Sequence, residues 1–218
     1  YNIDFLIAAM IILLLVLWHF LKQNRAADMN NQVFLFFAVI GILDVVAELC
    51  SNYYITSGVR NFGIAAMFAT TIFYLFQALF PFTFICYIQT LHDNKIVSAR
   101  KMLLSGLPTL VLAAVVLTNP FTGKLFYFDV SAGYIKGPWY MLMYYNAIGH
   151  LMIALLLIVI WRKSLGRWNI TVLLEIFVIS GAGVLVQIFC YPLLTTGFGI
   201  SLGILALFIT INNPYANM

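Results

Sequence analysis

The chain has 218 residues, of which 64% are apolar and only 8% are charged, whereas soluble domains have roughly 45–50% apolar and about 25% charged residues. A soluble globule is excluded because it needs more surface charge, and disorder is excluded because disordered chains combine low hydrophobicity with high charge. The net charge of +4 comes without a basic run, so the composition predicts an all-α integral membrane protein that contacts lipid and no nucleic acid.

Seven apolar segments are candidates to cross a bilayer, which takes roughly 17–25 residues of helix. The last two are contiguous, so the turn between them must be short. Seven crossings in one domain, residues 1–218, are favoured, and six crossings are the alternative. The segments are 4–21, 33–54, 62–90, 102–118, 139–161, 170–191 and 192–211.

Basic residues predict the orientation, because cytoplasmic loops are rich in Lys and Arg. With seven crossings, three basic residues, Arg60, Lys124 and Lys136, fall on one side, and the remaining eight of the eleven fall on the other. We therefore expect the N-terminus outside and the C-terminus in the cytoplasm. The eight are Lys22, Arg25, Lys95, Arg100, Lys101, Arg162, Lys163 and Arg167.

The longest loop, residues 119–138, lies outside in this topology. Aromatic and β-branched residues flank a three-residue turn, 131–133, that contains Gly133, and this pattern is typical of a β-hairpin. The hairpin between the fourth and fifth helices either packs as a lid on the helix ends or contacts a ligand.

The sequence lacks the residues that several known activities of membrane proteins require. The last lysine is Lys163 in a cytoplasmic loop, so a retinal Schiff base in the last helix is excluded. Neither a zinc-protease His-Glu-x-x-His motif nor a phosphate-binding Gly-rich loop is present. The three cysteines, Cys50, Cys86 and Cys190, have neither disulfide nor metal spacing. We expect no catalytic residue, metal or cofactor in this chain.

Ionisable residues inside the apolar segments indicate a ligand site, because charge in hydrocarbon costs roughly 2.5–3.5 kcal/mol and is kept mainly for function. Asp44 and Glu48 are four residues apart on one helical face, and no Lys or Arg lies at their depth, so at least one should be protonated. We expect these residues to form a polar, ligand-binding pocket that opens outward. The alternative is that they form a hydrogen-bonded cluster that only fixes helix packing. Counting depth along the helices places five residues in the pocket, Asp44, Glu48, Tyr74, Asn146 and His150, with Ser180 close by.

A second polar layer is predicted nearer the cytoplasm. Counting along the helices places three residues, His19, Gln77 and Glu175, about 8 Å from that edge of the hydrocarbon core. A relay or packing role is favoured for them over ligand binding. Gly199 and Gly203 form a small-xxx-small face on the last helix. That face allows close packing inside the bundle, or, alternatively, a homodimer contact.

Several segments resemble a bacterial sensor region over nearly the whole chain. They are 5–9 with 18–21, 34–37 with 41–44, and, in the external loop, 119–123 (Asn-Pro-Phe-Thr-Gly) with 126–129 (Phe-Tyr-Phe-Asp) and 137–138 (Gly-Pro). They resemble the seven-transmembrane N-terminal module that precedes GGDEF diguanylate cyclase domains, mostly in Gram-positive bacteria. The chain is more distantly similar to the seven-helix N-terminal region of certain histidine kinases. The external Asn-Pro loop with its Gly-Pro is the most specific part.

The resemblance implies a receptor in the bacterial inner membrane that takes part in signal transduction. Such a sensor binds an external or membrane-borne small ligand and relays the signal through its last helix to a fused cytoplasmic output domain, here a diguanylate cyclase that makes cyclic di-GMP. The chain stops at Met218 before the Asp-x-Leu-Thr-Gly-Leu motif that opens such a domain, so we expect the enzyme to lie outside it. A small-molecule transporter is the alternative, although neither repeats nor broken helices are recognisable. The ligand is not identified by the sequence.

Overall fold

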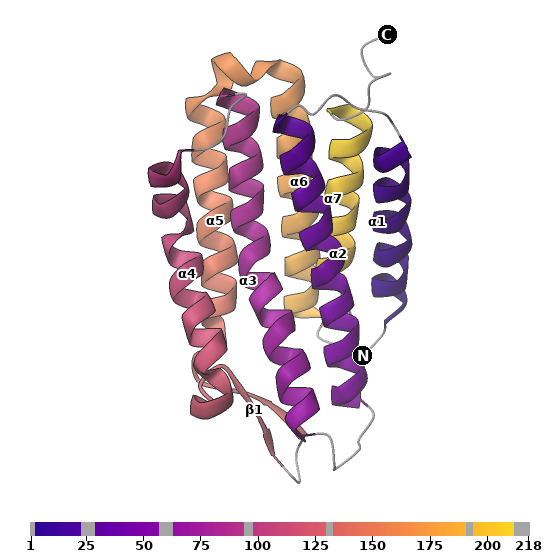
Figure 1. Ribbon diagram of the computed structural model, residues 1–218, viewed down its shortest axis with the longest axis vertical. Helices are drawn as coiled ribbons and strands as arrows, with labels where there is room; N and C mark the ends of the chain where they lie inside the picture. Colours follow the sequence, from indigo (N-terminus) through magenta and orange to yellow (C-terminus); the bar gives the residue numbers. More distant parts are fainter. Residues whose placement is uncertain are drawn as a thin grey trace.

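The computed structural model describes residues 3–22, 29–56, 63–93, 98–129, 133–190 and 194–211, and this part of the chain forms seven helices and two strands (Figure 1). Each predicted apolar segment corresponds to one helix. The elements are α1 (Asp4–Lys22), α2 (Met29–Thr56), α3 (Gly63–Asp93), α4 (Ala99–Thr122), β1 (Phe126–Asp129), β2 (Gly133–Lys136), α5 (Met141–Ile160), α6 (Arg162–Phe189) and α7 (Thr196–Thr210).

Local sequence explains where α4 begins and ends. The side chain of Ser98 accepts a hydrogen bond from the Lys101 N–H at the N-cap, and Gly123 takes the left-handed conformation at the C-cap, with φ of 60°. The N–H of Gly123 then donates to the Asn119 carbonyl at 2.8 Å. The helix therefore runs through Asn119 and Pro120, which were expected in the external loop.

The helix α6 begins earlier than predicted. Residues 162–169 were expected in a loop, but they are helical apart from Gly166, whose φ of 74° and ψ of 154° interrupt the helix. Figure 1 shows this orange segment crossing the end of the bundle before α6 turns down along it. The short turn expected between the last two segments lies partly outside the described residues, since 191–193 are not among them.

The helices lie side by side along the long axis of the molecule (Figure 1). The helix α2 packs mainly on α3 and α1, α3 also contacts α4 and α5, and α7 packs between α6 and α1. Aromatic side chains fill the core between α2 and α3, where Phe37 stacks on Phe80 with ring centroids 4.8 Å apart. The strands β1 and β2 pair antiparallel, with Phe126 opposite Lys136, at the end of the bundle where α3 begins (Figure 1).

The outward faces of the helices are apolar, with large exposed side chains such as Ile11, Leu110, Leu156 and Val178. Six helices, α1 to α6, are long and apolar enough to cross a membrane, whereas α7 is apolar but has 15 residues. By length and composition the chain is therefore an all-α, multi-pass membrane protein.

Charge separates along the bundle in the way that the loop counting predicted. Among the described basic residues, Lys124 and Lys136 belong to the hairpin region, whereas the other six lie at the opposite ends of the helices. Three more, Arg25, Arg60 and Lys95, lie outside the described residues. The six are Lys22, Arg100, Lys101, Arg162, Lys163 and Arg167.

Candidate functional site

The hairpin is anchored to the bundle by the side chain of Asn119, which is fully buried. Its Oδ1 accepts from the Leu125 N–H at 2.7 Å, and its Nδ2 donates to the Phe126 carbonyl at 2.9 Å. Leu125 and Phe126 are themselves fully buried against Phe73 and Tyr74 of α3. The hairpin thus packs on the helix ends as a lid, which was one of the two roles predicted for it.

Gly137 lets the chain return from β2 close to the end of α4. A Cβ at this position would lie 2.2 Å from the Lys124 carbonyl oxygen, a distance that only glycine avoids. This approach allows the Gly137 N–H to donate to the Leu125 carbonyl at 2.7 Å and the Trp139 N–H to donate to the Lys124 carbonyl at 2.9 Å. The Asn-Pro and Gly-Pro motifs therefore both bind residues 124–126, and together they hold the hairpin against the bundle.

A polar cavity of about 60 Å³, named here the outer cavity, lies between β2 and the helices α2, α3, α5 and α6. Its wall carries one carboxylate, one ammonium, several amides and hydroxyls, and four phenol rings. The hairpin supplies two of these residues, so it contacts the cavity as well as packing on the helices. The polar lining comprises Glu48, Ser51, Asn52, Thr70, Tyr74, Gln77, Tyr134, Lys136, Tyr140, Tyr144 and Gln187.

Glu48 is the acidic group of the outer cavity. It is only 2% exposed, and its carboxylate accepts no hydrogen bond from any residue in the described ranges; the Asn52 amide donates to its main-chain carbonyl instead, at 2.9 Å. A Cβ placed on Gly197 would lie 3.1 Å from Glu48 Oε2, so the carboxylate abuts the first turn of α7. Positive helix-dipole charge at this terminus favours a carboxylate there.

Tyrosine side chains link the hairpin to the helices around the outer cavity. The hydroxyls of Tyr74 and Tyr134 are hydrogen-bonded to each other, and the Tyr140 hydroxyl lies 3.4 Å from that of Tyr144. The Lys136 ammonium lies 4.3 Å from the centroid of the Tyr140 ring. Burial raises the pKa of Tyr140 well above its ordinary value, and it lowers the pKa of Lys136.

A second cavity, of about 90 Å³ and named here the inner cavity, adjoins the outer one. Gln77, Tyr140, Tyr144 and Gln187 line both. Its wall is mostly apolar and comes from α2, α3, α5, α6 and α7. The apolar lining comprises Phe37, Phe80, Pro81, Phe84, Met143, Ala147, Leu151, Ile176, Phe177, Val184, Ile200 and Ile204.

The structure brings together only part of the predicted ligand set. Glu48 and Tyr74 line the outer cavity and His150 lines the inner one. Both ring nitrogens of His150 are engaged, Nε2 with Thr109 Oγ1 at 3.0 Å and Nδ1 with the Asn146 carbonyl at 2.8 Å.

The other two members of the set lie outside both cavities. Asn146 faces a groove between α4 and α5 and donates to the Ala78 carbonyl at 3.2 Å. Asp44 is 1% exposed, and its Oδ1 has no hydrogen-bond partner among the described residues.

The predicted inner layer is not assembled. Gln77 lines the two cavities beside the outer-layer residues, whereas His19 and Glu175 are exposed on the outside of the bundle. His19 Nδ1 is paired only with the Leu15 carbonyl one turn earlier, at 2.9 Å. Depth alone had grouped these three residues, but their helices rotate two of them away from the interior.

Cavity residues that depth counting missed, such as Ser51, Asn52 and Thr70, can be recognised in the sequence by their helical spacing from the predicted ones. Ser51 and Asn52 follow Glu48 by three and four residues on α2, and the hydroxyl of Ser51 is hydrogen-bonded to that of Thr70 at 2.9 Å. Thr70, Tyr74 and Gln77 repeat at the same spacing on α3. Polar residues at this period in two adjacent apolar helices predict one shared polar seam.

Gly199 and Gly203 pack inside the bundle. A Cβ on Gly199 would lie 3.2 Å from the Ile179 carbonyl oxygen, and one on Gly203 would lie 3.0 Å from Ile176 Cγ2. Both contacts are with α6, so the described structure uses this face for helix packing. The face lies directly beside the inner cavity, because Ile176 and the neighbouring Ile200 and Ile204 line it.

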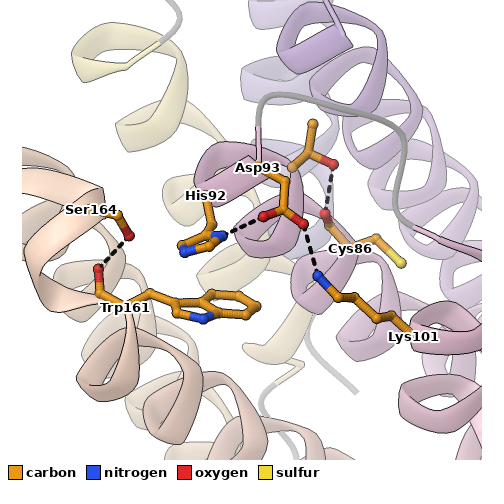
Figure 2. Close-up of polar contacts among 7 residues, drawn as sticks. Cys86, His92, Asp93, Lys101, Trp161 and Ser164 are labelled. Carbon is orange, nitrogen blue, oxygen red and sulfur yellow. Dashed lines mark hydrogen bonds and ion pairs between the residues drawn. The ribbon is translucent and has the colours of Figure 1, made fainter.

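A separate polar cluster lies at the opposite end of the bundle (Figure 2). Asp93 at the end of α3 contacts His92 Nδ1 at 2.6 Å and Lys101 Nζ of α4 at 2.9 Å. The His92 ring stacks on Trp161, with centroids 4.2 Å apart, and Ser164 donates to the Trp161 carbonyl at 2.9 Å. These contacts join α3, α4 and the junction of α5 with α6, and their partial exposure makes the ion pairs weak.

Comparison with known proteins gives no relative: no family model matches the chain, and neither the curated proteins nor the solved structures contain a match.

Proposed function

We propose that this chain is the membrane-embedded sensor of a bacterial signalling protein. A small ligand binds in the outer and inner cavities, and the resulting shift in helix packing passes through α7 to a cytoplasmic output domain, a diguanylate cyclase. The N-terminus and the hairpin lie outside, and α7 completes a seventh crossing. The chain itself carries no catalytic function.

The observation that carries this proposal is that the inner cavity is lined by α7 itself, through Thr196, Ile200 and Ile204. A ligand in the cavity therefore touches the last described helix directly. A ligand shifts an equilibrium only through different contacts with the two states, and a helix that forms part of the site provides such contacts. The Ser201 and Gly203 side of α7 is buried against its neighbours, so its movement must repack them.

The proposed orientation predicts the labelling of single cysteines in intact cells. In a variant without Cys50, Cys86 and Cys190, Tyr127→Cys in β1 should react with a membrane-impermeant maleimide, whereas Ser164→Cys at the start of α6 should react only after permeabilisation. Both parent side chains are exposed, so access to the reagent depends on the side of the membrane. The opposite labelling pattern would place the hairpin in the cytoplasm and overturn the orientation.

Filling the inner cavity should uncouple sensing from output. Ala147 of α5 lines this cavity, so Ala147→Phe occupies the space of a ligand. We expect cyclic di-GMP production by the full-length protein to change at least about fivefold and to stop responding to the ligand, since allosteric coupling is typically about 1–3 kcal/mol. Met152→Phe on the 60% exposed outer face of α5 is the matched control. Unchanged output from Ala147→Phe at equal membrane levels would contradict a sensor.

A transporter is the second candidate, and one observation favours it. Pro81 interrupts the hydrogen bonding of α3 beside the inner cavity, and interrupted helices frequently line the sites of carriers. In that case Ala147→Phe would abolish uptake of the ligand into cells while the output activity stayed at its basal level.

A further inference from the structure

The outer cavity holds a buried acidic group that forms no ion pair with any described residue. Only 2% of the Glu48 surface is exposed. No Lys or Arg of the described residues lies within salt-bridge distance of its carboxylate. A buried carboxylate without a partner is costly. Hydrogen-bonding groups and phenol rings surround it on the same wall, among them Asn52, Tyr74 and Tyr140, and such a mixture suits an ammonium group.

A group of the opposite charge lies on the wall of the same cavity. Lys136 extends from β2, a different element from that of Glu48, and its ammonium lies over the Tyr140 ring. Burial there lowers the pKa of Lys136, because desolvation disfavours the charged form. A carboxylate bound in the outer cavity would therefore meet a cationic group that belongs to the cavity wall.

The adjoining inner cavity offers an apolar compartment. Phe80, Phe84 and Ile204 are among its walls, and Gln77 and Tyr144 line both this cavity and the outer one. The two volumes, about 60 and 90 Å³, are together on the order of a cavity that holds one benzene molecule, about 150 Å³. The two compartments are thus suited to a compact molecule with a charged end and an apolar end.

We propose that the ligand is a free amino acid with an apolar side chain, whose ammonium group binds Glu48, whose carboxylate binds Lys136 and whose side chain enters the inner cavity. This inference rests on the proposed function, since it identifies the ligand of the same site. An acid on α2, a base on β2 and an apolar compartment between α3, α5, α6 and α7 correspond to the three parts of such a molecule. The ligand would then hold the hairpin, α2 and α7 in one arrangement.

The test is a titration of the chain in lipid nanodiscs with leucine, isoleucine, valine, methionine and phenylalanine, followed by analogues of leucine that each lack one part. The analogues are 3-methylbutylamine, which lacks the carboxylate, 4-methylpentanoate, which lacks the ammonium, and glycine, which lacks the side chain. We expect at least one apolar amino acid to bind, and each corresponding analogue to bind at least about tenfold more weakly, because each loses one buried contact.

Two variants separate direct contact from a loss of folding. Glu48→Gln should weaken leucine at least about tenfold and leave 4-methylpentanoate unchanged, whereas Lys136→Met should weaken leucine and leave 3-methylbutylamine unchanged. A general loss of folding would affect all ligands alike. Equal binding of leucine and 3-methylbutylamine, or no effect of Lys136→Met, would overturn the assignment of an amino acid.

The outcomes also distinguish this inference from the proposed function. If none of the amino acids binds but Ala147→Phe still alters cyclic di-GMP output, the amino-acid ligand is wrong and the sensor stands. If Ala147→Phe leaves the output unchanged, the sensor is wrong, and binding of an amino acid would then indicate a carrier.

Discussion

Alanine in place of Gly137 should unfold the hairpin and destabilise the whole chain by about 3 kcal/mol or more, because overpacking adds to the loss of buried hydrogen bonds. The new Cβ would lie 2.2 Å from the Lys124 carbonyl oxygen and 2.8 Å from that of Gly123. Both are main-chain atoms, so no change of rotamer relieves the overlap. The bonds from the Gly137 and Trp139 N–H groups to Leu125 and Lys124, between α4 and β1, would be lost. Thermal unfolding of the purified protein in detergent measures the effect.

The matched control is Gly149→Ala on α5, where a Cβ meets nothing within 4 Å. Alanine is favoured over glycine inside a helix by about 0.5–1 kcal/mol, so this variant should be unchanged or slightly more stable. Asn119→Ala is an independent way to release the hairpin, since it removes the partners of the Leu125 N–H and the Phe126 carbonyl. Trypsin should then cut faster at Lys124 and Lys136. Wild-type stability and cleavage in both Gly137→Ala and Asn119→Ala would show that the hairpin is not anchored in this way.

The helices are predictable from the sequence because a segment in hydrocarbon must satisfy its own backbone hydrogen bonds, and length with apolarity is then sufficient to find them. The two strands follow from local aromatic and β-branched residues around Gly133, although residues 130–132 between them lie outside the described ranges. The ends of helices were less predictable. The α4 C-cap is Gly123, and the Asn119 side chain on the last turn binds residues six and seven positions further along the chain; both features lie past the expected loop boundary.

The candidate site was predictable in depth but not in rotation about the helix axes. Counting along α2 located Glu48, whereas Glu175 and His19 were counted to a shared depth although their side chains are exposed on the outside of the bundle. Gln77 was assigned too near the cytoplasm because α3 has 31 residues, more than a bilayer core needs, and a long helix tilts or projects beyond it. Lys136 and Tyr140 entered the site only through the folding of the hairpin, which depth counting does not describe.

Leucine in place of Gly203 should have the largest effect on signalling. Even the Cβ would lie 3.0 Å from Ile176 Cγ2, so the full side chain must separate α7 from α6 or push Ile176 into the inner cavity that it lines. We expect basal cyclic di-GMP output of the full-length protein to change at least about fivefold, the lower range of allosteric coupling. Because Ile176 lines the inner cavity, we expect ligand affinity to fall as well.

Gly181→Leu on α6 is the control, because a Cβ there meets nothing within 4 Å while the gain in helix propensity is the same. Output is compared at matched membrane levels, and binding is measured on the purified chain with whichever amino acid binds the wild type. Since a switch from 1:99 to 99:1 would require about 5.5 kcal/mol, a partial shift is the expected form of the response. If Gly203→Leu changes affinity but not output, the α6–α7 contact shapes the cavity without carrying the signal; if it changes neither, the two glycines serve packing alone and the route through α7 is wrong.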